Sequence, residues 1–401
     1  MSARAASRRS TGLRPASMLL AAVSKGGQPG RVLSPQIDRF RTGGLSTLLR
    51  ERKTGGRDES QRLAANHTET YCRIWRHAAD RVGADIEHLQ DGFMVIRSAA
   101  RETLVWRHLV MMDHPSTTAF ALNKTVVHQL LTRLDIPVPE HMELDRRQRG
   151  TALEFIQQAS SAVPGHVVKP AAGTSGGAGV TCNVRTAEDL IRAWLGAGRW
   201  EGRILVERQA PGEEYRLLFL DGELLDVVRR RPASVRGDGT SSVGQLIDAE
   251  NRRRLSLASA EVARLIRVDL DCALALSRQG LTLGSVPARG SRVAVKGTVS
   301  QNATSDNETV AEVSPELVAQ CASAARAMRL RLAGVDVVTP DISVPLRSSG
   351  GVVLEVNGTP GFHYHYQVAN ADRSVPVAVP ILERLLDDST AGRMQAAGDL
   401  S

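Results

Sequence analysis

The chain has 401 residues and carries 51 lysines and arginines against 43 aspartates and glutamates, for a formal net charge of +8. This length predicts two or three lobes rather than one core, and an apolar content of 42% excludes a largely disordered chain. Aromatic residues make up 3%, which argues against a stacking platform for single-stranded nucleic acid. Most bases are arginines, and the lysines are Lys25, Lys53, Lys124, Lys169 and Lys296. We expect such rare lysines where a compact ammonium group is needed.

The spacing of the cysteines and the lack of long apolar runs exclude further classes of protein. Cys72, Cys182, Cys272 and Cys321 are widely scattered, so neither a zinc site nor a disulfide framework is expected. No apolar run reaches the roughly 18 residues that a membrane span needs. Acidic residues are absent before Asp38, as in a transit peptide or in an ordinary disordered basic tail. We expect a soluble cytoplasmic protein, with no membrane partner and an oligomeric state that the sequence does not reveal.

The spacing of apolar residues predicts alternating helices and strands. In the first part of the chain we expect a helix over 71–82, a strand within 101–111, a helix over 124–134, strands over 166–169 and near 180, a helix over 186–195, a strand over 203–208 and a hairpin over 215–230. Further on we expect a mostly helical stretch over 248–290, a long helix over 315–332 that Gly334 ends, and strands over 335–338 and 352–356. This mixed order favours an α+β fold of several lobes over a doubly wound sheet.

A glycine-rich stretch follows the strand that contains Lys169. It reads Gly173-Thr-Ser-Gly-Gly-Ala-Gly179 and holds four glycines in seven positions. Such a backbone can approach a ligand closely and turn its amides toward an anion. The stretch is neither a Walker A loop nor a dinucleotide fingerprint. We interpret it as a flap over phosphates, with an ordinary hairpin turn as the alternative.

Three oxygen-bearing side chains lie on the two last predicted strands. Glu355 and Asn357 are two residues apart and so point to one face of their strand, and Asp336 on the preceding strand can project beside them. Two carboxylates and an amide are hard oxygen donors that suit Mg²⁺ held together with nucleotide phosphates. Burying them for structural reasons alone would be costly. The sequence therefore predicts a metal site here.

Taken in order, these segments resemble the ATP-grasp family of carboxylate–amine ligases, and in particular the ATP-grasp portion of cyanophycin synthetase. Glutathione-synthetase-like and D-alanine–D-alanine-ligase-like enzymes are less similar. The resemblance covers roughly residues 117–385. Besides the motifs above, it rests on Asn123-Lys124 before a helix that ends Ile-Pro-Val-Pro, on Arg229-Arg-Arg-Pro232, and on the segments 237–247 and 279–288.

The resemblance implies an ATP-grasp fold of two α+β lobes gripping ATP, with site residues at matching positions. Phosphate-binding roles fall on Lys124 and Lys169, and the flap on Gly173, Thr174, Ser175, Gly176 and Gly177. The adenine-binding hinge corresponds to Glu207, Arg208, Gln209 and Ala210, the ribose-binding acid to Glu214, and the metal ligands to Asp336, Glu355 and Asn357. Catalytic cations near the transferred phosphoryl group correspond to Lys296, Arg216 and Arg230. The implied cofactors are ATP and one or two Mg²⁺ ions, with Mn²⁺ as a substitute.

On this basis the chain is divided into four parts. Residues 1–65 are expected to form a disordered basic extension, 66–118 a small domain, 119–388 the ATP-grasp domain and 389–401 a disordered C-terminal tail. The sequence departs from the family at 300–306, where cyanophycin-type enzymes have a Gly-Gly pair. The loop 362–366, Phe-His-Tyr-His-Tyr, has no family role; it lines a substrate pocket or is a packed aromatic loop.

The implied function is an ATP-dependent ligase that activates a carboxylate as an acyl phosphate and joins it to an amine of an amino acid or peptide. One alternative is the same chemistry on a macromolecule, such as a precursor peptide or basic protein, with residues 1–65 as a recognition arm. Another is a non-catalytic, regulatory ATP-binding protein, including one associated with nucleic acid. Low aromatic content and the full set of catalytic positions argue against this last alternative.

Overall fold

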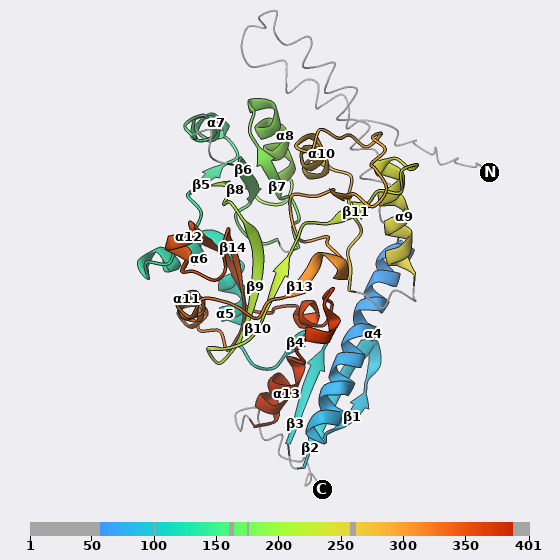
Figure 1. The fold of residues 1–401 in the computed structure, drawn as a ribbon. Coiled ribbons are helices and arrows are strands. Elements are labelled where there is room, and N and C mark those ends of the chain that lie inside the picture. The colour runs from blue at the N-terminus through green and yellow to red at the C-terminus, as the bar shows by residue number, and fades with distance from the viewer. Residues whose placement is uncertain (1–56, 100, 160–163, 175, 257–261, 388–401) are drawn as a thin grey trace, which may run out of the picture. The chain divides into compact units, whose positions relative to one another are not determined.

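The computed structural model describes residues 57–99, 101–159, 164–174, 176–256 and 262–387. Helices and largely antiparallel sheets alternate along this part of the chain, which confirms the predicted α+β class (Figure 1). The tails predicted to be disordered lie mostly outside the described residues. Within these residues, no helix combines the length and the apolar character that a membrane crossing demands.

The first described region is a long helix beside a small antiparallel sheet. Helix α4 (Arg57–Val82) is followed by strands in the order β1 (Asp85–His88), β2 (Phe93–Ser98), β3 (Arg101–Trp106) and β4 (Leu109–Val110). Tyr71, Trp75 and Ala78 bury one face of α4 in a core shared with the C-terminal helix α13 (Ala378–Asp387), which lies alongside it (Figure 1). The sequence placed residues 57–65 in the disordered extension; they are helical, because the apolar face of α4 anchors a helix that continues N-terminally through polar residues.

A second sheet carries the glycine-rich loop. Its strand order is β5 (His141–Asp145), β8 (Arg203–Arg208), β6 (His166–Pro170) and β7 (Thr181–Val184), all antiparallel. Helices α7 (Arg149–Gln157) and α8 (Ala187–Ala197) share its core. The hydroxyl of Thr186 accepts from the Asp189 amide at 3.1 Å and begins α8, as the sequence predicts. The antiparallel pairing of β6 with β7 makes the loop between them a hairpin connection.

The third sheet positions the acidic residues. Its order is β13 (Asn307–Thr309), β10 (Glu223–Arg230), β9 (Glu213–Leu220), β14 (Leu332–Thr339) and β15 (Val352–Asn357). The predicted hairpin turns at Asp221 and Gly222, both with positive φ. Helices α6 (Lys124–Arg133) and α11 (Pro315–Ala327) contribute to its main core, with α5 (Pro115–Ala121) and α12 (Leu346–Ser349) beside it.

Two predictions about the second half of the chain are wrong. Helix α11 ends at Ala327 rather than at 332, because Arg329 adopts a left-handed conformation with φ +53°. Gly334 is therefore not a helix cap: it lies inside β14, where a side chain would crowd Pro360 and Arg216.

The stretch 248–290 is also less helical than predicted. It contains the end of α9 (Val243–Leu255) and α10 (Leu270–Ser277), and after α10 the chain continues in turns beside the small sheet β11 (Ser234–Arg236)–β12 (Arg292–Ala294). Its apolar side chains form a separate small core with that sheet. Gly280 and Gly290 adopt positive φ, +70° and +82°, which interrupts a helix in the second half of the stretch. All four cysteines lie in the described part of the chain, where they are buried free thiols.

Candidate active site

The three side chains predicted to bind a metal meet on the paired strands β14 and β15. The strands are antiparallel, with Asp336 opposite Glu355 and Gly334 opposite Asn357. The amide nitrogen of Asn357 lies 3.3 Å from Asp336 Oδ2 and 3.3 Å from Glu355 Oε1. Asp336 is 2% exposed and the other two are half-buried. The structure thus brings two carboxylates and an amide together at one point of the sheet.

Arg216 and Arg230 supply positive charge beside these carboxylates. Strand β9 places Arg216 opposite Asp336, and its guanidinium binds both carboxylate oxygens, with Nη2 2.6 Å from Oδ2. Arg230 Nη1 lies 3.1 Å from Glu214 Oε1 and 3.7 Å from Asp336 Oδ1. The ring of Tyr364 lies 4.3 Å from the Arg230 guanidinium carbon. Both predicted catalytic arginines are therefore buried next to the predicted metal ligands.

The proton affinities of the acids follow from this crowding. Burial and the negative charge of Asp336 raise the pKa of Glu355. Burial raises the pKa of Glu214 to about 7, although Arg230 opposes the shift. Burial also acts to raise the pKa of Asp336, but the Arg216 guanidinium outweighs it and lowers that pKa. Neighbouring buried carboxylates repel each other, so a bound cation would stabilise their charged forms.

Lys124 and Lys169 approach this group from helix α6 and strand β6. Lys124 begins helix α6, where Asn123 Oδ1 accepts from the Val126 amide at 3.1 Å, and its own amide donates to the Ala171 carbonyl at 3.2 Å. Lys169 Nζ forms a 2.7 Å ion pair with Glu207 Oε1. Burial lowers the pKa of Lys124, and the charge of Glu355 partly offsets this effect. Lys124 thus lies within electrostatic reach of both Lys169 and Glu355.

His128, which was not among the predicted site residues, connects the lysines to the acidic strand. Its Nε2 donates to the Leu354 carbonyl at 3.0 Å, and its Nδ1 lies 4.0 Å from Glu207 Oε1. Because Leu354 precedes Glu355, this hydrogen bond fixes α6 against β15. The sequence signal that could have identified His128 is its position one helical turn after Lys124, which places both residues on the same face of α6.

The glycine-rich loop folds against the segment after Lys296. Gly177 has φ +74°, and a Cβ there would collide with the Ser300 hydroxyl; a Cβ at Gly176 would collide with the Arg264 guanidinium. Gly173 and Thr174 belong to the same loop, whereas the predicted flap residue Ser175 lies outside the described residues. Loop and neighbour are therefore packed so closely that glycine is required.

Lys296 is engaged by two acids that the sequence analysis did not select. Its Nζ lies 2.5 Å from Asp269 Oδ1 and 3.3 Å from Asp271 Oδ2. Asp271 also accepts from the amides of Cys182 at 3.0 Å and Gly297 at 3.0 Å. Burial acts to lower the pKa of Lys296, but the two aspartates outweigh it and raise that pKa. The ammonium group remains charged and is held beside strand β7.

The predicted adenine hinge comprises the last two residues of strand β8 and the two residues after it. The amides of Arg208 and Gln209 donate to the carbonyls of Glu140 and Gly165, at 2.8 and 2.9 Å. A purine edge at this segment must therefore bond to carbonyls or to the amide of Ala210. Glu207 is 2% exposed, and its carboxylate faces Lys169 rather than solvent.

The loop 362–366 divides between the two interpretations that the sequence left open. His363 is buried, with Nδ1 2.9 Å from the Tyr71 hydroxyl, and His365 is buried with Nδ1 2.7 Å from Asp226 Oδ2. Tyr364 covers the Arg230 guanidinium, whereas Tyr366 lines a separate pocket. The histidines thus belong to packing, and Tyr364 alone borders the candidate active site.

Comparison with known proteins gives the family. No protein-family model matches the chain. The chain is 34% identical over 286 residues to a cyanophycin synthetase from Synechocystis sp., covering 68% of this chain and 31% of that protein. It is 31% identical over 254 residues to the glutathione biosynthesis bifunctional protein GshAB of Streptococcus mutans, covering 61% of this chain and 32% of that protein. A bifunctional glutathione synthetase from Pasteurella multocida aligns in structure with a TM-score of 0.48 and 24% identity, covering 77% of this chain and 42% of that one.

The lysine pair, the glycine-rich hairpin and the carboxylate-bearing strands, together with these sequence matches, define the class: the chain belongs to the ATP-grasp family of ligases. Within that family its matched segment is similar to part of cyanophycin synthetase. The chain spans about a third of the length of the curated relatives that it matches. Family membership implies the use of ATP and a divalent metal ion.

Proposed function

We propose that the chain is an ADP-forming ligase that joins a carboxylate to an amine of an amino acid or peptide at the expense of ATP. The observation that carries the proposal is the group formed by Lys124, Lys169, Asp336, Glu355 and Asn357. Cations for a triphosphate and oxygen donors for its metal ion meet in it, although they come from segments up to 233 residues apart along the chain, 124 to 357. We propose the cytoplasm as its compartment.

Asp336, Glu355 and Asn357 would hold one or two Mg²⁺ ions, with Mn²⁺ as a substitute. The fit rests on their chemistry: all three offer hard oxygens, and desolvation together with the neighbouring charge of Asp336 raises the pKa of Glu355 despite Lys124 and Arg216. Asp336 already binds Arg216 with both oxygens, so it would be shared between the guanidinium and the metal. When bound, the metal neutralises charge on the phosphates.

The reaction requires positioning and charge neutralisation rather than a covalent nucleophile. A carboxylate oxygen of the substrate attacks the terminal phosphorus of ATP, the bond to the bridging oxygen breaks, and ADP leaves. The amine then attacks the acyl carbon, the carbon–oxygen bond to phosphate breaks, and the nitrogen loses a proton. Lys124, Lys169, Arg216 and Arg230 offset the negative charge of the phosphates, and the loop 173–179 excludes water from the acyl phosphate.

A phosphate-release screen tests the proposal. Amino acids and short peptides are offered singly and in pairs with Mg-ATP to the full chain, to Lys169→Ala and to Glu355→Ala. We expect one substrate pair to stimulate phosphate release, with a loss of at least a hundredfold in both variants. Stimulated release that persists in both variants would overturn the site assignment. ATP binding without release for any substrate, including a candidate precursor peptide, would favour a regulatory protein.

A further inference from the structure

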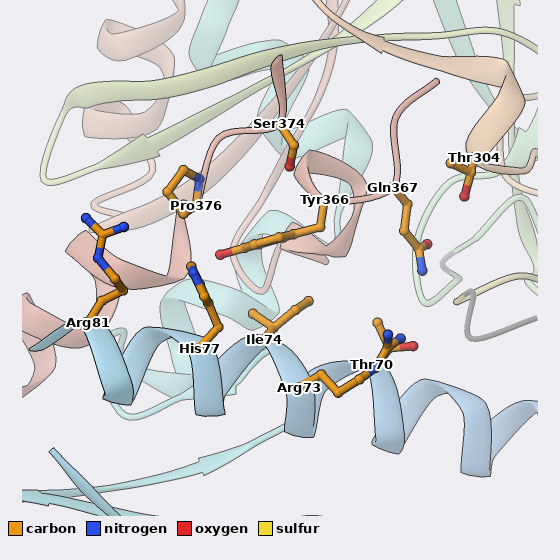
Figure 2. Close-up of a pocket in the computed structure, with 10 residues that line it drawn as sticks. All are labelled: Thr70, Arg73, Ile74, His77, Arg81, Thr304, Tyr366, Gln367, Ser374 and Pro376. Carbon is orange, nitrogen blue, oxygen red and sulfur yellow. The ribbon is translucent and has the colours of Figure 1, made fainter. Parts of the chain in front are cut away.

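A second pocket lies between helix α4 and the chain segment that follows the loop 362–366. Its volume is about 610 Å³, within the range of small-molecule sites. The residues that line it are Thr70, Arg73, Ile74, His77, Arg81, Thr304, Tyr366, Gln367, Ser374 and Pro376 (Figure 2). They include no member of the candidate active site and, among the described residues, no acid.

The wall formed by α4 carries a row of bases. Arg73, His77 and Arg81 recur at intervals of four residues and so lie on one face of the helix, over a length of about 12 Å. In Figure 2 their side chains follow one another along the edge of the pocket. All three are exposed to solvent, and within the described contacts neither His77 nor Arg81 forms an ion pair. Arg81 therefore presents to an occupant a positive charge that no described ion pair compensates, and His77 adds a ring nitrogen beside it.

The floor of the same pocket is apolar. Ile74 is buried beneath it, and the ring of Tyr366 extends over Ile74 and His77 (Figure 2). Pro376 lines the pocket just before α13, and the Tyr366 hydroxyl accepts from the Ala378 amide at 2.9 Å while it keeps its own proton to donate. The floor offers contact area but few hydrogen bonds. An ion without an apolar part would leave the apolar floor of the pocket exposed to water.

We infer that this pocket binds an amphipathic organic anion: a carboxylate attached to an apolar or aromatic body. The body packs on Ile74, Tyr366 and Pro376, and the carboxylate pairs with Arg81 and His77. A free small acid and the C-terminal carboxylate of a peptide ending in an apolar residue share this chemistry. Binding at this pocket does not involve ATP. An experiment can therefore overturn it without overturning the proposed ligase activity.

The pocket is connected to the candidate active site by short hydrogen bonds. Ser374, on its wall, donates to the His365 carbonyl at 3.0 Å, and the Tyr366 amide donates to the His363 carbonyl at 3.0 Å. Between these residues lies Tyr364, which covers the Arg230 guanidinium. An occupant that touches Tyr366 and Ser374 therefore contacts the same loop that borders the predicted metal ligands.

The test is a titration of the full chain, without ATP, using 3-phenylpropionate as the probe and the uncharged 3-phenylpropionamide as its isostere. We expect the acid to bind at least tenfold more tightly than the amide, and Arg81→Gln to remove about a tenfold share of that affinity. Arg76→Gln removes the same charge from α4 outside the pocket and should leave binding unchanged. Lys169→Ala, in the candidate active site, should also leave it unchanged.

Equal affinity for acid and amide, equal effects of Arg81→Gln and Arg76→Gln, or no binding at millimolar probe would each overturn the inference. A tripeptide ending in phenylalanine, with a free or an amidated C-terminus, identifies the source of the anion. Tighter binding of the free tripeptide than of 3-phenylpropionate supports a peptide end as the occupant. Tighter binding of 3-phenylpropionate supports a free small acid.

Discussion

Arg216 and Asp336 form a buried pair across neighbouring strands, with Nη2 of the guanidinium 2.6 Å from Oδ2 of the carboxylate. Arg216 is 6% exposed and Asp336 is 2% exposed, so water screens the pair little. The same carboxylate lies beside Glu355, and the charges of Lys124 and Arg216 only partly offset the resulting rise in the pKa of Glu355. The pair thus fixes the charge balance of the candidate metal site before any ligand binds.

Arg216→Gln should destabilise the fold by about 3–5 kcal/mol, because it leaves the carboxylates of Asp336 and Glu355 buried with one cation fewer. Urea unfolding of both proteins measures this difference. Arg229→Gln is the matched control: Arg229 is also paired on this sheet, but it is only partly buried, and we expect a loss of about 1 kcal/mol or less. Equal losses of stability in the two variants would show that the buried pair of Arg216 and Asp336 contributes no more than the partly buried ion pairs of Arg229.

The pKa of Glu214, raised to about 7, predicts a pH dependence of stability. An acid whose pKa is higher in the folded state than in the unfolded state binds more protons when folded, so stability falls as pH rises from about 4.5 to 7. Glu214→Gln should show a smaller fall over this range, measured by urea unfolding at several pH values. Histidines with a lowered pKa, such as the half-buried His67 at about 3, change stability in the opposite sense and are common to both proteins. Parallel pH profiles would contradict the assignment.

Lys169 and Glu207 should depend on each other for stability. Lys169→Met leaves the 2%-exposed Glu207 carboxylate without its 2.7 Å partner, which we expect to cost about 3 kcal/mol. Lys169→Met combined with Glu207→Gln should recover much of that loss, because no buried charge remains unpaired. Nucleotide binding should be weak in both variants, since the phosphate-binding ammonium is missing from both. Thermal unfolding and nucleotide titration measure the two effects separately, and recovery of nucleotide binding in the double variant would contradict the proposed role of Lys169.

Gly177→Ala should impair catalysis more than it impairs folding. The new methyl group collides with the Ser300 hydroxyl and forces the loop away from the segment after Lys296, so we expect a drop in turnover of roughly tenfold or more. Gly83→Ala imposes a similar positive φ, +68° against +74°, but meets no atom within 4 Å. It should cost about 1 kcal/mol of stability and leave turnover unchanged. Comparable turnover in the two variants would exclude a close-packing role for Gly177.

The sequence correctly predicted those features of the molecule that depend on one short segment alone. Asp221-Gly222 turns a hairpin, Thr186 caps α8, and the spacing of Glu355 and Asn357 places both on one face of β15. Local backbone preference and side-chain periodicity suffice at these positions. The prediction of a long helix up to 332 failed because apolar spacing continues from α11 into β14 across the short connection 328–331, in which Arg329 is left-handed.

Contacts between distant segments could not be predicted. Asp269 and Asp271 surround Lys296 from α10, Glu207 neutralises Lys169 from a neighbouring strand, and His128 fixes α6 to β15. None of these pairings leaves a spacing pattern in the sequence, because each depends on how the sheets and helices pack. The sequence did not indicate the pocket beside α4 for the same reason: its two sides, one on α4 and the other around Tyr366, are about 300 residues apart along the chain.

The central claim is that a carboxylate is activated as an acyl phosphate at this site. Its most direct test uses the substrate pair found by phosphate release, with both oxygens of the carboxylate labelled with ¹⁸O, and mass spectrometry of every product. The mechanism predicts one labelled oxygen in the released inorganic phosphate and one in the amide product, with ADP unlabelled. Label in AMP, or phosphate free of label while amide forms, would contradict it.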